Sequence, residues 1–443
     1  MAARKFVHAT VPLKDFLKRR VAPIDKVARP LDTLNVIAKV TFGGELFLRN
    51  DKAKRGYKGP LFEALPGDLI ISKIRVGQGS FCVIGDTLDH VAVSPEYPIY
   101  APDPTMVDRD YLAMVIRTPE FMAELTGKAS GNTTKRRIRP EFFETRRIPL
   151  PPLPEQQAIV SAWRAALDHA AALEREAAET EAKSALAFES ALGFTPSTPL
   201  PDRPIFVANF KDIERWSHDG ILRAVLHIVD PAPKFATSPL SSVGKVSYGL
   251  QKFPGNRPTS YARPYLAVVN VQRWRLDLNK VKMISVPDED MPKYRLEYGD
   301  VLLCEGNSPE LVGRGAIWRD EIPDCVHQNH VLRVRLDQTK ALPEFVLSVI
   351  NSSYGQAYFR SKAKRTTNLA SINSKEVGGF PLPLPTVPEQ QDMIDQLFGG
   401  QAAAKQKREE AAKARAKAWT DFETAVYSAE VVEETAALIA AAF

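Results

Sequence analysis

Residues 149–157 have the sequence PLPPLPEQQ, and residues 383–391 have the sequence PLPTVPEQQ. The two stretches lie 234 positions apart. Upstream of them, PGDLII at 66–71 has a counterpart in YGDVLL at 298–303. A period of this length is far too long for a solenoid. The sequence therefore predicts one half-molecule that is present twice, each copy being a domain followed by a second element.

A long helix is expected after each proline-rich stretch. Proline disfavours helical backbone in the residue before it, but no proline occurs between Pro154 and Pro196 or after Pro388. Ala, Glu, Gln, Lys and Arg dominate these regions, as they do in stable helices. Glu155 and Glu389 would occupy the first turn, where a carboxylate complements the helix dipole. At 1.5 Å per residue, each helix would be on the order of 50–60 Å long.

The apolar stripe of each predicted helix is narrow and consists mostly of small side chains. In the second helix it passes Gly399-Gly400, which we expect to be a weak point, and Gly193 is expected to end the first helix. Because so narrow a stripe cannot stabilise a helix alone, we expect the two helices to pair antiparallel. The expected stripe residues are Val160, Trp163, Leu167, Ala170, Leu173, Ala177, Thr180, Ser184, Ala187 and Ala191 in the first helix, and Met393, Ile394, Leu397, Phe398, Trp419, Phe422 and Val426 in the second.

The regions before the helices show short apolar runs punctuated by Gly and Pro, which indicates mixed α/β domains. The predicted fold class is therefore α+β, with two mixed α/β domains separated by two long antiparallel helices that form a coiled coil. Strands are expected at 69–74, 81–84, 266–271 and 331–336, and short helices at 111–125 and 343–359.

Charge follows the same division of the chain. The formal net charge is +6, but residues 1–154 carry +8 and residues 194–388 carry +6. The helical regions 155–193 and 389–443 carry −4 each. We expect these four segments to be domain 1, the first helix, domain 2, and the second helix with a C-terminal tail. Two basic domains are the electrostatic footprint of a protein that contacts a nucleic-acid duplex at two places, although ordinary charge scatter is the alternative.

Two places in each copy concentrate side chains suited to phosphate oxygens and base edges. The first precedes the proline-rich stretch, and the second follows the Gly-Asp pair, where the two copies carry different side chains. Different side chains on a shared scaffold are what recognition of two different half-sequences requires, whereas the alternative is a solvated loop. The predicted contacts are Lys73, Arg75, Gln78, Ser80, Thr133, Thr134, Lys135, Arg136 and Arg137 in copy one, and Asn307, Arg314, Lys364, Arg365, Thr366, Thr367 and Asn368 in copy two.

The motif His327-Gln328-Asn329-His330 has the spacing of a metal-binding pair, but no third ligand is near in sequence. We expect Gln328 and Asn329 to be polar strand-edge residues near a nucleic acid, and we expect no metal or cofactor. The sequence has no Gly-rich phosphate loop and no amino-methyltransferase motif, so no catalytic residues are assigned. It also lacks an apolar run long enough to cross a membrane and an apolar signal segment, and its three cysteines are scattered. These features predict a cytoplasmic location without membrane contact.

The doubled PLP-x-x-PEQQ motif opening a long helix resembles the specificity (S) subunits of type I restriction-modification systems. Three further stretches resemble the family: YGLQK at 248–252, PYLAVVNVQ at 264–272 and QNHVLR at 328–333. The resemblance covers nearly the whole chain. Many relatives have Arg where this chain has Ala267, and the first 60 residues match the family pattern weakly.

The resemblance implies a non-catalytic subunit whose two target recognition domains each bind one half of a bipartite double-stranded DNA sequence. It also implies that the helices separate the domains and dock two modification (methyltransferase) subunits, with restriction (translocase and endonuclease) subunits joining the full complex. In such a subunit the helix pair would set the spacing between half-sites. A coiled-coil protein-protein adaptor without DNA specificity is the alternative, and a free-standing nuclease or methyltransferase is a third possibility.

Overall fold

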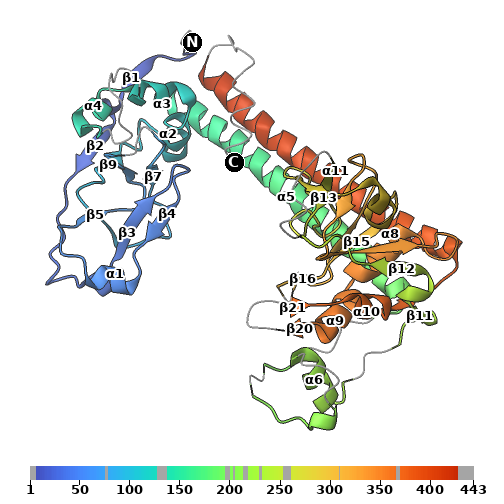
Figure 1. Ribbon diagram of the computed structural model, residues 1–443. Coiled ribbons are helices and arrows are strands. Elements are labelled where there is room, and N and C mark those ends of the chain that lie inside the picture. Colours follow the sequence, from blue (N-terminus) through green and yellow to red (C-terminus); the bar gives the residue numbers. More distant parts are fainter. Residues whose placement is uncertain are drawn as a thin grey trace. The chain divides into compact units, whose positions relative to one another are not determined.

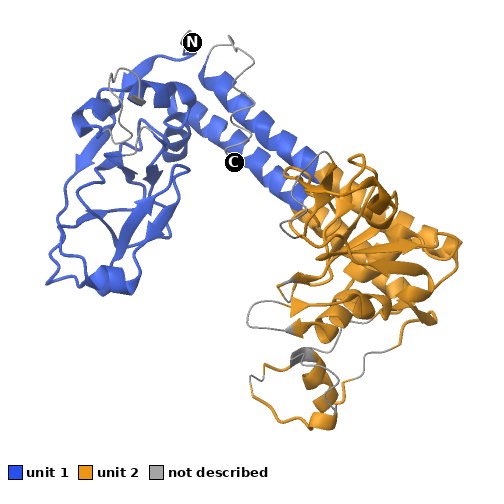
Figure 2. Ribbon diagram, in the orientation of Figure 1, with its two compact units in different colours: residues 1–174, 408–443 blue, residues 175–407 orange. Residues whose placement is uncertain are grey.

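The computed structural model describes residues 6–74, 78–126, 137–194, 200–202, 205–212, 218–228, 232–252, 261–308, 310–365 and 370–427. The chain divides into two compact units (Figure 2). Unit 1 comprises residues 1–174 and 408–443, and unit 2 comprises residues 175–407. The two long helices, α5 (Leu153–Ala191) and α11 (Val387–Val426), therefore each contribute residues to both units (Figure 1).

Unit 1 contains two four-stranded sheets of short strands, ordered β2-β9-β6-β7 and β4-β3-β8-β5, and the two-stranded pair β1-β10. Three short helices follow the last sheet strand, and one helix lies between β4 and β5. The elements are β1 (Thr10–Pro12), β2 (Leu17–Arg20), β3 (Asn35–Val40), β4 (Leu46–Leu48), α1 (Asp51–Arg55), β5 (Phe62–Ala64), β6 (Leu69–Ile71), β7 (Phe81–Val83), β8 (Val91–Val93), β9 (Ile99–Pro102), α2 (Arg109–Val115), α3 (Pro119–Thr126), α4 (Pro140–Glu144) and β10 (Arg147–Pro149).

Unit 2 repeats this plan. Its four-stranded sheet is ordered β12-β19-β15-β17, its second sheet β14-β13-β18, and its edge pair β11-β22, with a small third sheet β16-β21-β20. The elements are α6 (His218–Val225), β11 (Thr237–Pro239), β12 (Gly244–Ser247), β13 (Ala262–Leu266), β14 (Lys282–Ser285), α7 (Met291–Tyr294), β15 (Val301–Cys304), β16 (Gly306–Asn307), β17 (Gly315–Ile317), β18 (Val326–His327), β19 (Val331–Leu336), α8 (Pro343–Asn351), α9 (Ser353–Lys362), β20 (Lys364–Arg365), β21 (Ala370–Ser371), α10 (Ser374–Gly378) and β22 (Pro381–Pro383). The mixed α+β fold class is confirmed.

The repeated Glu-Gln-Gln motif has a structural function in each unit. Gln156 is fully buried; its amide nitrogen donates to the carbonyl oxygens of Met106 (2.9 Å) and Pro151 (2.8 Å), and its carbonyl oxygen accepts from the Asp108 amide (2.8 Å). Because all the hydrogen-bonding capacity of a buried amide must be satisfied, this side chain fixes the first turn of α5 against the loop before α2.

Gln390 makes the same three bonds in unit 2. It donates to the carbonyl oxygens of Lys340 (2.9 Å) and Pro385 (3.0 Å), and it accepts from the Leu342 amide (2.9 Å). Each of these partners lies 234 residues after its counterpart in unit 1. The motif therefore repeats because each long helix is attached to its own domain by an identical buried amide.

The two long helices run antiparallel within each unit and share a seven-residue repeat of small buried side chains. Ala170 and Ala177 in α5, and Ala404, Ala411 and Ala418 in α11, are at most 5% exposed. This spacing is that of a left-handed coiled coil, and alanine allows close approach of the two backbones. In unit 1 the Trp163 and Trp419 rings lie 5.7 Å apart between centroids, and Glu174 and Arg415 form an ion pair at 2.6 Å. In unit 2 Glu176 forms an ion pair with Lys407.

Gly399-Gly400, the expected weak point, does not interrupt α11. The helix is continuous from Val387 to Val426. A Cβ atom on Gly400 would lie 2.4 Å from the Cβ of Ser184, so the absence of a side chain here is what permits the two helices to touch. Glycine lowers the intrinsic stability of a helix, and the close packing of the two helices offsets this loss.

Each long helix is attached to one domain at its start and packs on the core of the other domain at its end. Phe422, Val426 and Tyr427 join the core of unit 1, whereas Phe188 and Leu192 join the core of unit 2. The prediction that Ala187 belongs to the buried stripe was wrong, because Ala187 is exposed and Phe188 takes the buried position. Gly193, with φ of +74°, follows the end of α5 as predicted.

Four further predictions of elements need correction. The expected helix at 111–125 is two helices, because the Thr118 hydroxyl bonds to the Val115 carbonyl oxygen between them. The expected helix at 343–359 is also two, because the Ser352 side chain accepts from the Gly355 amide and begins α9. The strand expected at 266–271 ends at Leu266, since the buried Asn270 side chain accepts from the Ala267 amide and turns the chain. The strand expected at 69–74 ends at Ile71.

Within the described ranges, no helix combines the length and the apolar character needed to cross a bilayer.

Removing either buried glutamine should destabilise its own unit. Gln156→Ala and Gln390→Ala would each leave buried carbonyl and amide groups without partners, at an expected cost of about 2–4 kcal/mol. We expect native-state hydrogen exchange to show lower protection in unit 1 for the first variant and in unit 2 for the second. The neighbouring Gln157 and Gln391 are exposed, so Gln157→Ala and Gln391→Ala serve as controls with unchanged protection. Equal loss in the controls would contradict the assigned role.

Candidate nucleic-acid interface

In each unit the backbone brings together the two places that the sequence singled out. The Ile138 amide donates to the Lys73 carbonyl oxygen at 2.7 Å in unit 1. The Ile372 amide donates to the Glu305 carbonyl oxygen at 2.9 Å in unit 2. The segment before the proline-rich stretch therefore lies beside the loop that follows the Gly-Asp strand in both copies, and the two places form one surface in each unit.

In unit 1 the described part of this surface contains Lys73, Gln78 and Arg137. Gln78 is exposed, and Arg137 forms an ion pair with Glu96 at 2.5 Å. Ser80 is fully buried, so its hydroxyl is not on the surface and the prediction of a contact there does not hold. The predicted contacts Arg75, Thr133, Thr134, Lys135 and Arg136 lie outside the described residues.

In unit 2 a small sheet positions three of the predicted residues. β21 pairs with both β16 and β20, so that Ala370 is the register partner of both Asn307 and Arg365. Lys364, in the same strand as Arg365, is exposed. The predicted contacts Thr366, Thr367 and Asn368 lie outside the described residues.

Gln328 and Asn329 belong to the same surface of unit 2. The Gln328 amide donates to the Leu266 carbonyl oxygen at 2.9 Å, and the Asn329 amide donates to the Leu250 carbonyl oxygen at 3.0 Å. The YGLQK and QNHVLR stretches thus lie side by side. The adjacent His330 contacts Glu305 through Nδ1 and a carboxylate oxygen at 2.6 Å, which connects this stretch to the loop after the Gly-Asp pair.

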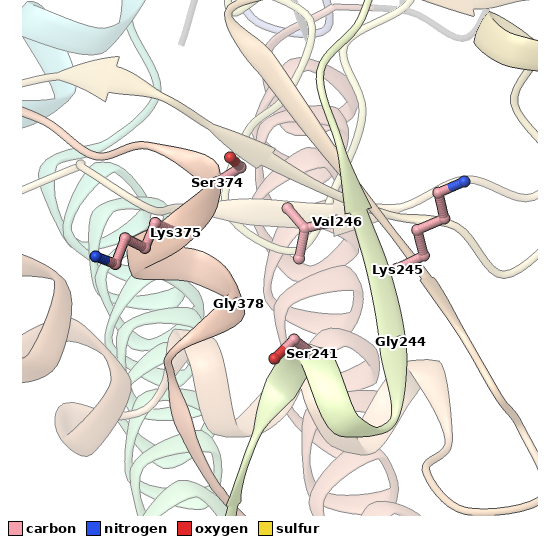
Figure 3. Close-up of a pocket in the computed structure, with 7 residues that line it drawn as sticks. All are labelled: Ser241, Gly244, Lys245, Val246, Ser374, Lys375 and Gly378. Atoms are coloured by element: carbon pink, nitrogen blue, oxygen red, sulfur yellow. The ribbon is translucent and has the colours of Figure 1, made fainter.

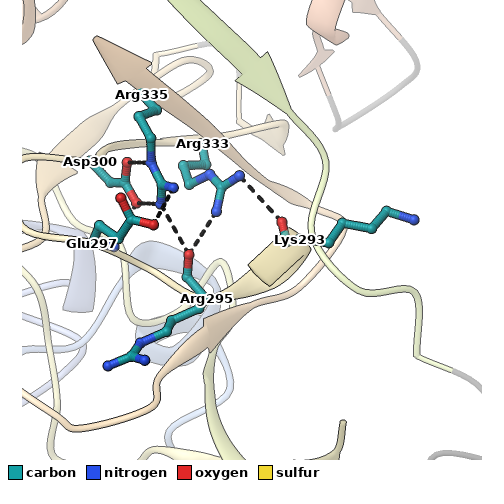
Figure 4. Close-up of polar contacts among 6 residues, drawn as sticks. All are labelled: Lys293, Arg295, Glu297, Asp300, Arg333 and Arg335. Atoms are coloured by element: carbon teal, nitrogen blue, oxygen red, sulfur yellow. Dashed lines mark hydrogen bonds and ion pairs between the residues drawn. The ribbon is translucent and has the colours of Figure 1, made fainter. Parts of the chain in front are cut away.

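A buried aspartate holds the Gly-Asp turn in both units. In unit 2 Asp300 accepts two bonds of 2.8 Å from the Arg335 guanidinium and one of 2.8 Å from the Glu297 amide (Figure 4). The equivalent Asp68 in unit 1 accepts from Arg20 at 2.7 and 3.1 Å and from the Leu65 amide at 2.8 Å. Bidentate guanidinium–carboxylate pairs are rigid, so the loops that follow start from a fixed point.

The neighbouring Arg333 is 5% exposed and donates to carbonyl oxygens instead. Its guanidinium bonds to the carbonyl oxygens of Arg295 (2.7 Å) and Lys293 (3.3 Å), where α7 ends (Figure 4). A cation at the end of a helix satisfies carbonyl groups that have no partner within the helix. Arg333 and Arg335 together therefore fix the segment that leads into β15.

His327 is a core residue. Its side chain is fully buried, and Nδ1 lies 2.7 Å from the Val331 carbonyl oxygen, which requires a proton on that nitrogen. Burial lowers the His327 pKa to about 4 against the raising effect of the Val331 bond, and the Arg333 cation lowers it further. Among the described residues, no group of three His, Cys, Asp or Glu side chains is placed to hold a metal ion.

A shallow cavity of about 510 Å³ lies between β12 and α10 in unit 2. Lys245 and Lys375 extend outward on opposite sides of it (Figure 3), and neither ammonium group has a partner in the described part of the chain. It adjoins the surface described above, because the Ser374 amide donates to the Tyr248 hydroxyl at 3.0 Å. The remaining lining residues are Ser241, Gly244, Val246 and Gly378.

The equivalent place in unit 1 is filled and neutralised. Arg19 stands where unit 2 has Val246, and it forms ion pairs with Glu141 (2.8 Å) and Glu144 (2.7 Å). Glu141 is the 234-residue counterpart of Lys375. Unit 1 thus has an arginine paired with two glutamates at the place where unit 2 has the lysines beside the cavity.

Sequence reasoning missed this cavity and the Glu305–His330 pair. Lys245 and Lys375 lie 130 residues apart, and neither belongs to a cluster of cations in the sequence. The signal in the sequence is the change of charge at the 234-residue counterpart, where unit 1 has Glu141 and unit 2 has Lys375.

Comparison with known proteins gives a consistent result, although no protein-family model matches the chain. A Methanocaldococcus jannaschii protein named as the MjaX specificity subunit of a type I restriction enzyme is 28% identical over 143 residues, 31% of this chain and 34% of that protein. The StySPI specificity subunit of Salmonella potsdam is 27% identical over 26% of each chain. The EcoKI specificity subunit of Escherichia coli is 24% identical over 34% of this chain and 33% of that protein. The matches thus span about a third or less of these curated relatives.

Two solved structures resemble the whole chain. The HsdS subunit from Thermoanaerobacter tengcongensis superposes with a TM-score of 0.52 at 15% identity, covering 96% of this chain and 97% of that one. A structure concerned with complex assembly and conformational transition of the type I R-M system gives a TM-score of 0.58 at 16% identity, covering 94% and 97%. At these identities the likeness shows the fold, which is that of HsdS subunits.

The buried His327 should make unit 2 sensitive to acid. Its pKa of about 4 lies below the ordinary value near 6.5, so its neutral form stabilises the fold fully above about pH 6.5 and this contribution is lost as the pH falls toward 4. We expect up to about 3 kcal/mol of lost stability, because a protonated Nε2 would be buried without an acceptor. Protection factors of β19 amides between pH 7 and 4.5 measure this. His327→Gln should flatten the profile, whereas His330→Gln, at an exposed position, should not; identical profiles for both would contradict the assignment.

Proposed function

We propose that this chain is the DNA sequence-recognition subunit of a type I restriction-modification complex. Each target recognition domain, residues 1–154 and 194–388, binds one half of a bipartite double-stranded target. The chain itself carries no catalytic residues, and methyl transfer and cleavage belong to modification and restriction subunits that assemble with it in the cytoplasm. The specificity subunits among its relatives support this assignment.

The observation that carries the proposal is that one anchored framework occurs twice with different surface side chains. Gln156 and Gln390 make the same bonds, and Asp68 and Asp300 fix the same turn. On this common framework the loop side chains differ: Lys73 in one copy corresponds in place to Glu305 in the other, because their carbonyl oxygens accept from the equivalent amides of Ile138 and Ile372. A protein that recognises two different half-sites requires this combination.

The proposed contact residues are those of the surface shared by the two loops in each unit. We include Lys73, Arg75, Gln78, Thr133, Thr134, Lys135, Arg136 and Arg137 in domain 1, and Asn307, Arg314, Gln328, Asn329, Lys364, Arg365, Thr366, Thr367 and Asn368 in domain 2. Clustered cations, amides and hydroxyls suit phosphate oxygens, and Arg, Asn and Gln also suit base edges in the major groove.

The paired helices would set the gap between the half-sites and dock two modification subunits. α5 has 39 residues and α11 has 40. The seven-residue spacing of the buried alanines means that a whole heptad can be removed without changing which face is buried. The gap length can therefore be altered in a controlled way.

Deleting one heptad from each helix should shorten the gap. Residues 171–177 and 407–413 lie opposite each other near the Glu174–Arg415 and Glu176–Lys407 pairs. Their removal shortens the helix pair by about 10 Å, which corresponds to about three base pairs. The measurement is methylome sequencing of cells that express the chain with the products of its neighbouring genes, after co-purification has identified the partners.

We expect the same two half-sites with a shorter gap. An unchanged gap would contradict the spacing role, and a wild-type complex without sequence-dependent methylation or DNA binding would favour the adaptor alternative. Co-purification of the deleted chain with its partners controls for loss of assembly.

Lys375 and Lys245 should contribute to DNA affinity without affecting sequence choice. Each phosphate contact changes the slope of log K against log salt by about 0.9, so Lys375→Ala and Lys245→Ala should each make the slope less negative by about that amount. Lys18, the unit 1 counterpart of Lys245, lies beside the neutralised site, and Lys18→Ala is the control with an unchanged slope. Equal effects at Lys18 and Lys245 would show that the cavity has no special role.

A further inference from the structure

An exposed apolar side chain lies just beyond the end of an equivalent strand in both units. Phe42 follows β3 and is 53% exposed, and Val269 follows β13 and is 63% exposed. β3 pairs in parallel with β8 and antiparallel with β4. β13 likewise pairs in parallel with β18 and antiparallel with β14. Phe42 therefore lies in the connection between β3 and β4, residues 41–45, and Val269 lies in the connection between the equivalent strands β13 and β14, residues 267–281.

In unit 1 this connection lies against the predicted contact loop. A Cβ atom on Gly79 would lie 2.5 Å from the Phe42 carbonyl oxygen, and the φ of Gly79 is +89°, so only glycine fits there. The Arg117 guanidinium, mostly buried, donates to the carbonyl oxygens of Gly43 (3.3 Å) and Phe81 (2.9 Å). Arg117 thus ties the connection to the strand that follows Gln78, and Phe42 is held beside the candidate interface.

In unit 2 an arginine has the same role from a different position. Arg314 donates to the Val268 carbonyl oxygen at 3.5 Å, and the Trp274 amide donates to the Gly315 carbonyl oxygen at 2.9 Å. The Arg314 carbonyl oxygen accepts from the Cys304 amide at 3.0 Å, directly before Glu305, so Val269 also lies next to the candidate interface. Both connections are preorganised, which lowers the entropy cost of using their side chains in recognition.

The charge around both connections indicates a polyanionic partner. Residues 36–60 contain six Lys and Arg against two Asp and Glu, and residues 262–285 contain five against one. Both segments therefore carry a net charge of +4. An exposed apolar side chain within a basic segment fits a nucleic-acid surface better than an apolar protein surface, because DNA offers phosphates around the apolar groups in its grooves.

We propose that Phe42 and Val269 are specificity-determining residues that each contact the 5-methyl group of a thymine in the major groove, one in each half-site. The proposal rests on the proposed function and adds the base that these positions select. Thymine alone among the four bases presents a methyl group in the major groove, and apolar side chains distinguish it by excluding water. Because the aromatic ring of Phe42 is larger than the Val269 side chain, the contacted thymine can lie at a different position in each half-site.

The test replaces each thymine of the mapped target by deoxyuridine, which removes only the methyl group, and measures equilibrium binding by the full complex. For the wild type, one position in each half-site should lose about fourfold in affinity, the value of one buried methyl group. Phe42→Ala should abolish this loss in the first half-site only, and Val269→Gly should abolish it in the second half-site only.

Phe47 provides a matched control on the same hairpin. It is 45% exposed, and Lys39 covers its ring at 4.3 Å, so Phe47→Ala should keep the wild-type sensitivity to deoxyuridine. Because all three side chains are exposed, none of these changes should unfold the chain.

Two outcomes would overturn the proposal and leave the proposed function standing. In the first, the complex binds its bipartite target but no thymine is sensitive to deoxyuridine. In the second, the sensitivity to deoxyuridine persists in Phe42→Ala and Val269→Gly. A wild-type complex that shows no bipartite preference would overturn both, and this outcome appears before any substitution is made.

Discussion

A buried glutamine at the start of each long helix is the constraint on which the rest of the structure depends. Gln156 and Gln390 each make three hydrogen bonds to the loop in front of a domain helix and to their own proline-rich stretch. These bonds fix where each helix leaves its domain. The heptad of buried alanines then fixes how the helices pair, and Phe188 and Phe422 fix how each helix ends on the other domain's core. The same contacts, made twice, give each unit the same framework beneath its candidate interface.

The two units keep the same buried framework while their surface side chains differ. The aspartates Asp68 and Asp300 hold equivalent turns, but the arginine that binds each comes from a different strand, β2 in one unit and β19 in the other. Around these fixed points the surface side chains vary. Unit 1 has the Arg19–Glu141 pair where unit 2 has the open, basic cavity beside Lys375, and the connection after β3 exposes Phe42 whereas the connection after β13 exposes Val269. The buried residues that the two units share are therefore structural, whereas the exposed residues in which the units differ are the ones proposed to select bases.

The sequence predicted the duplication, the two long antiparallel helices and the α+β class, because these depend on repeated motifs and helical periodicity. It could not predict features that depend on tertiary contacts: Gly400 permits close packing on Ser184, Thr118 and Ser352 interrupt helices through hydroxyl bonds, and Asn270 ends a strand. The burial of Phe188 was predictable, since its 234-residue counterpart is Phe422. At the candidate interface, sequence clusters located Lys73, Asn307 and Arg365, but the Glu305–His330 pair and the Lys245–Lys375 cavity join residues that only the sheets bring together.

Two copies of one framework are each proposed to recognise their own DNA half-site. The most direct measurement is selection of bound duplexes from a randomised library by the purified complex, followed by sequencing. We expect two separate blocks of specified base pairs, with a gap of fixed length and no sequence preference between them. A single continuous block, or no enrichment above the starting library, would contradict the proposal.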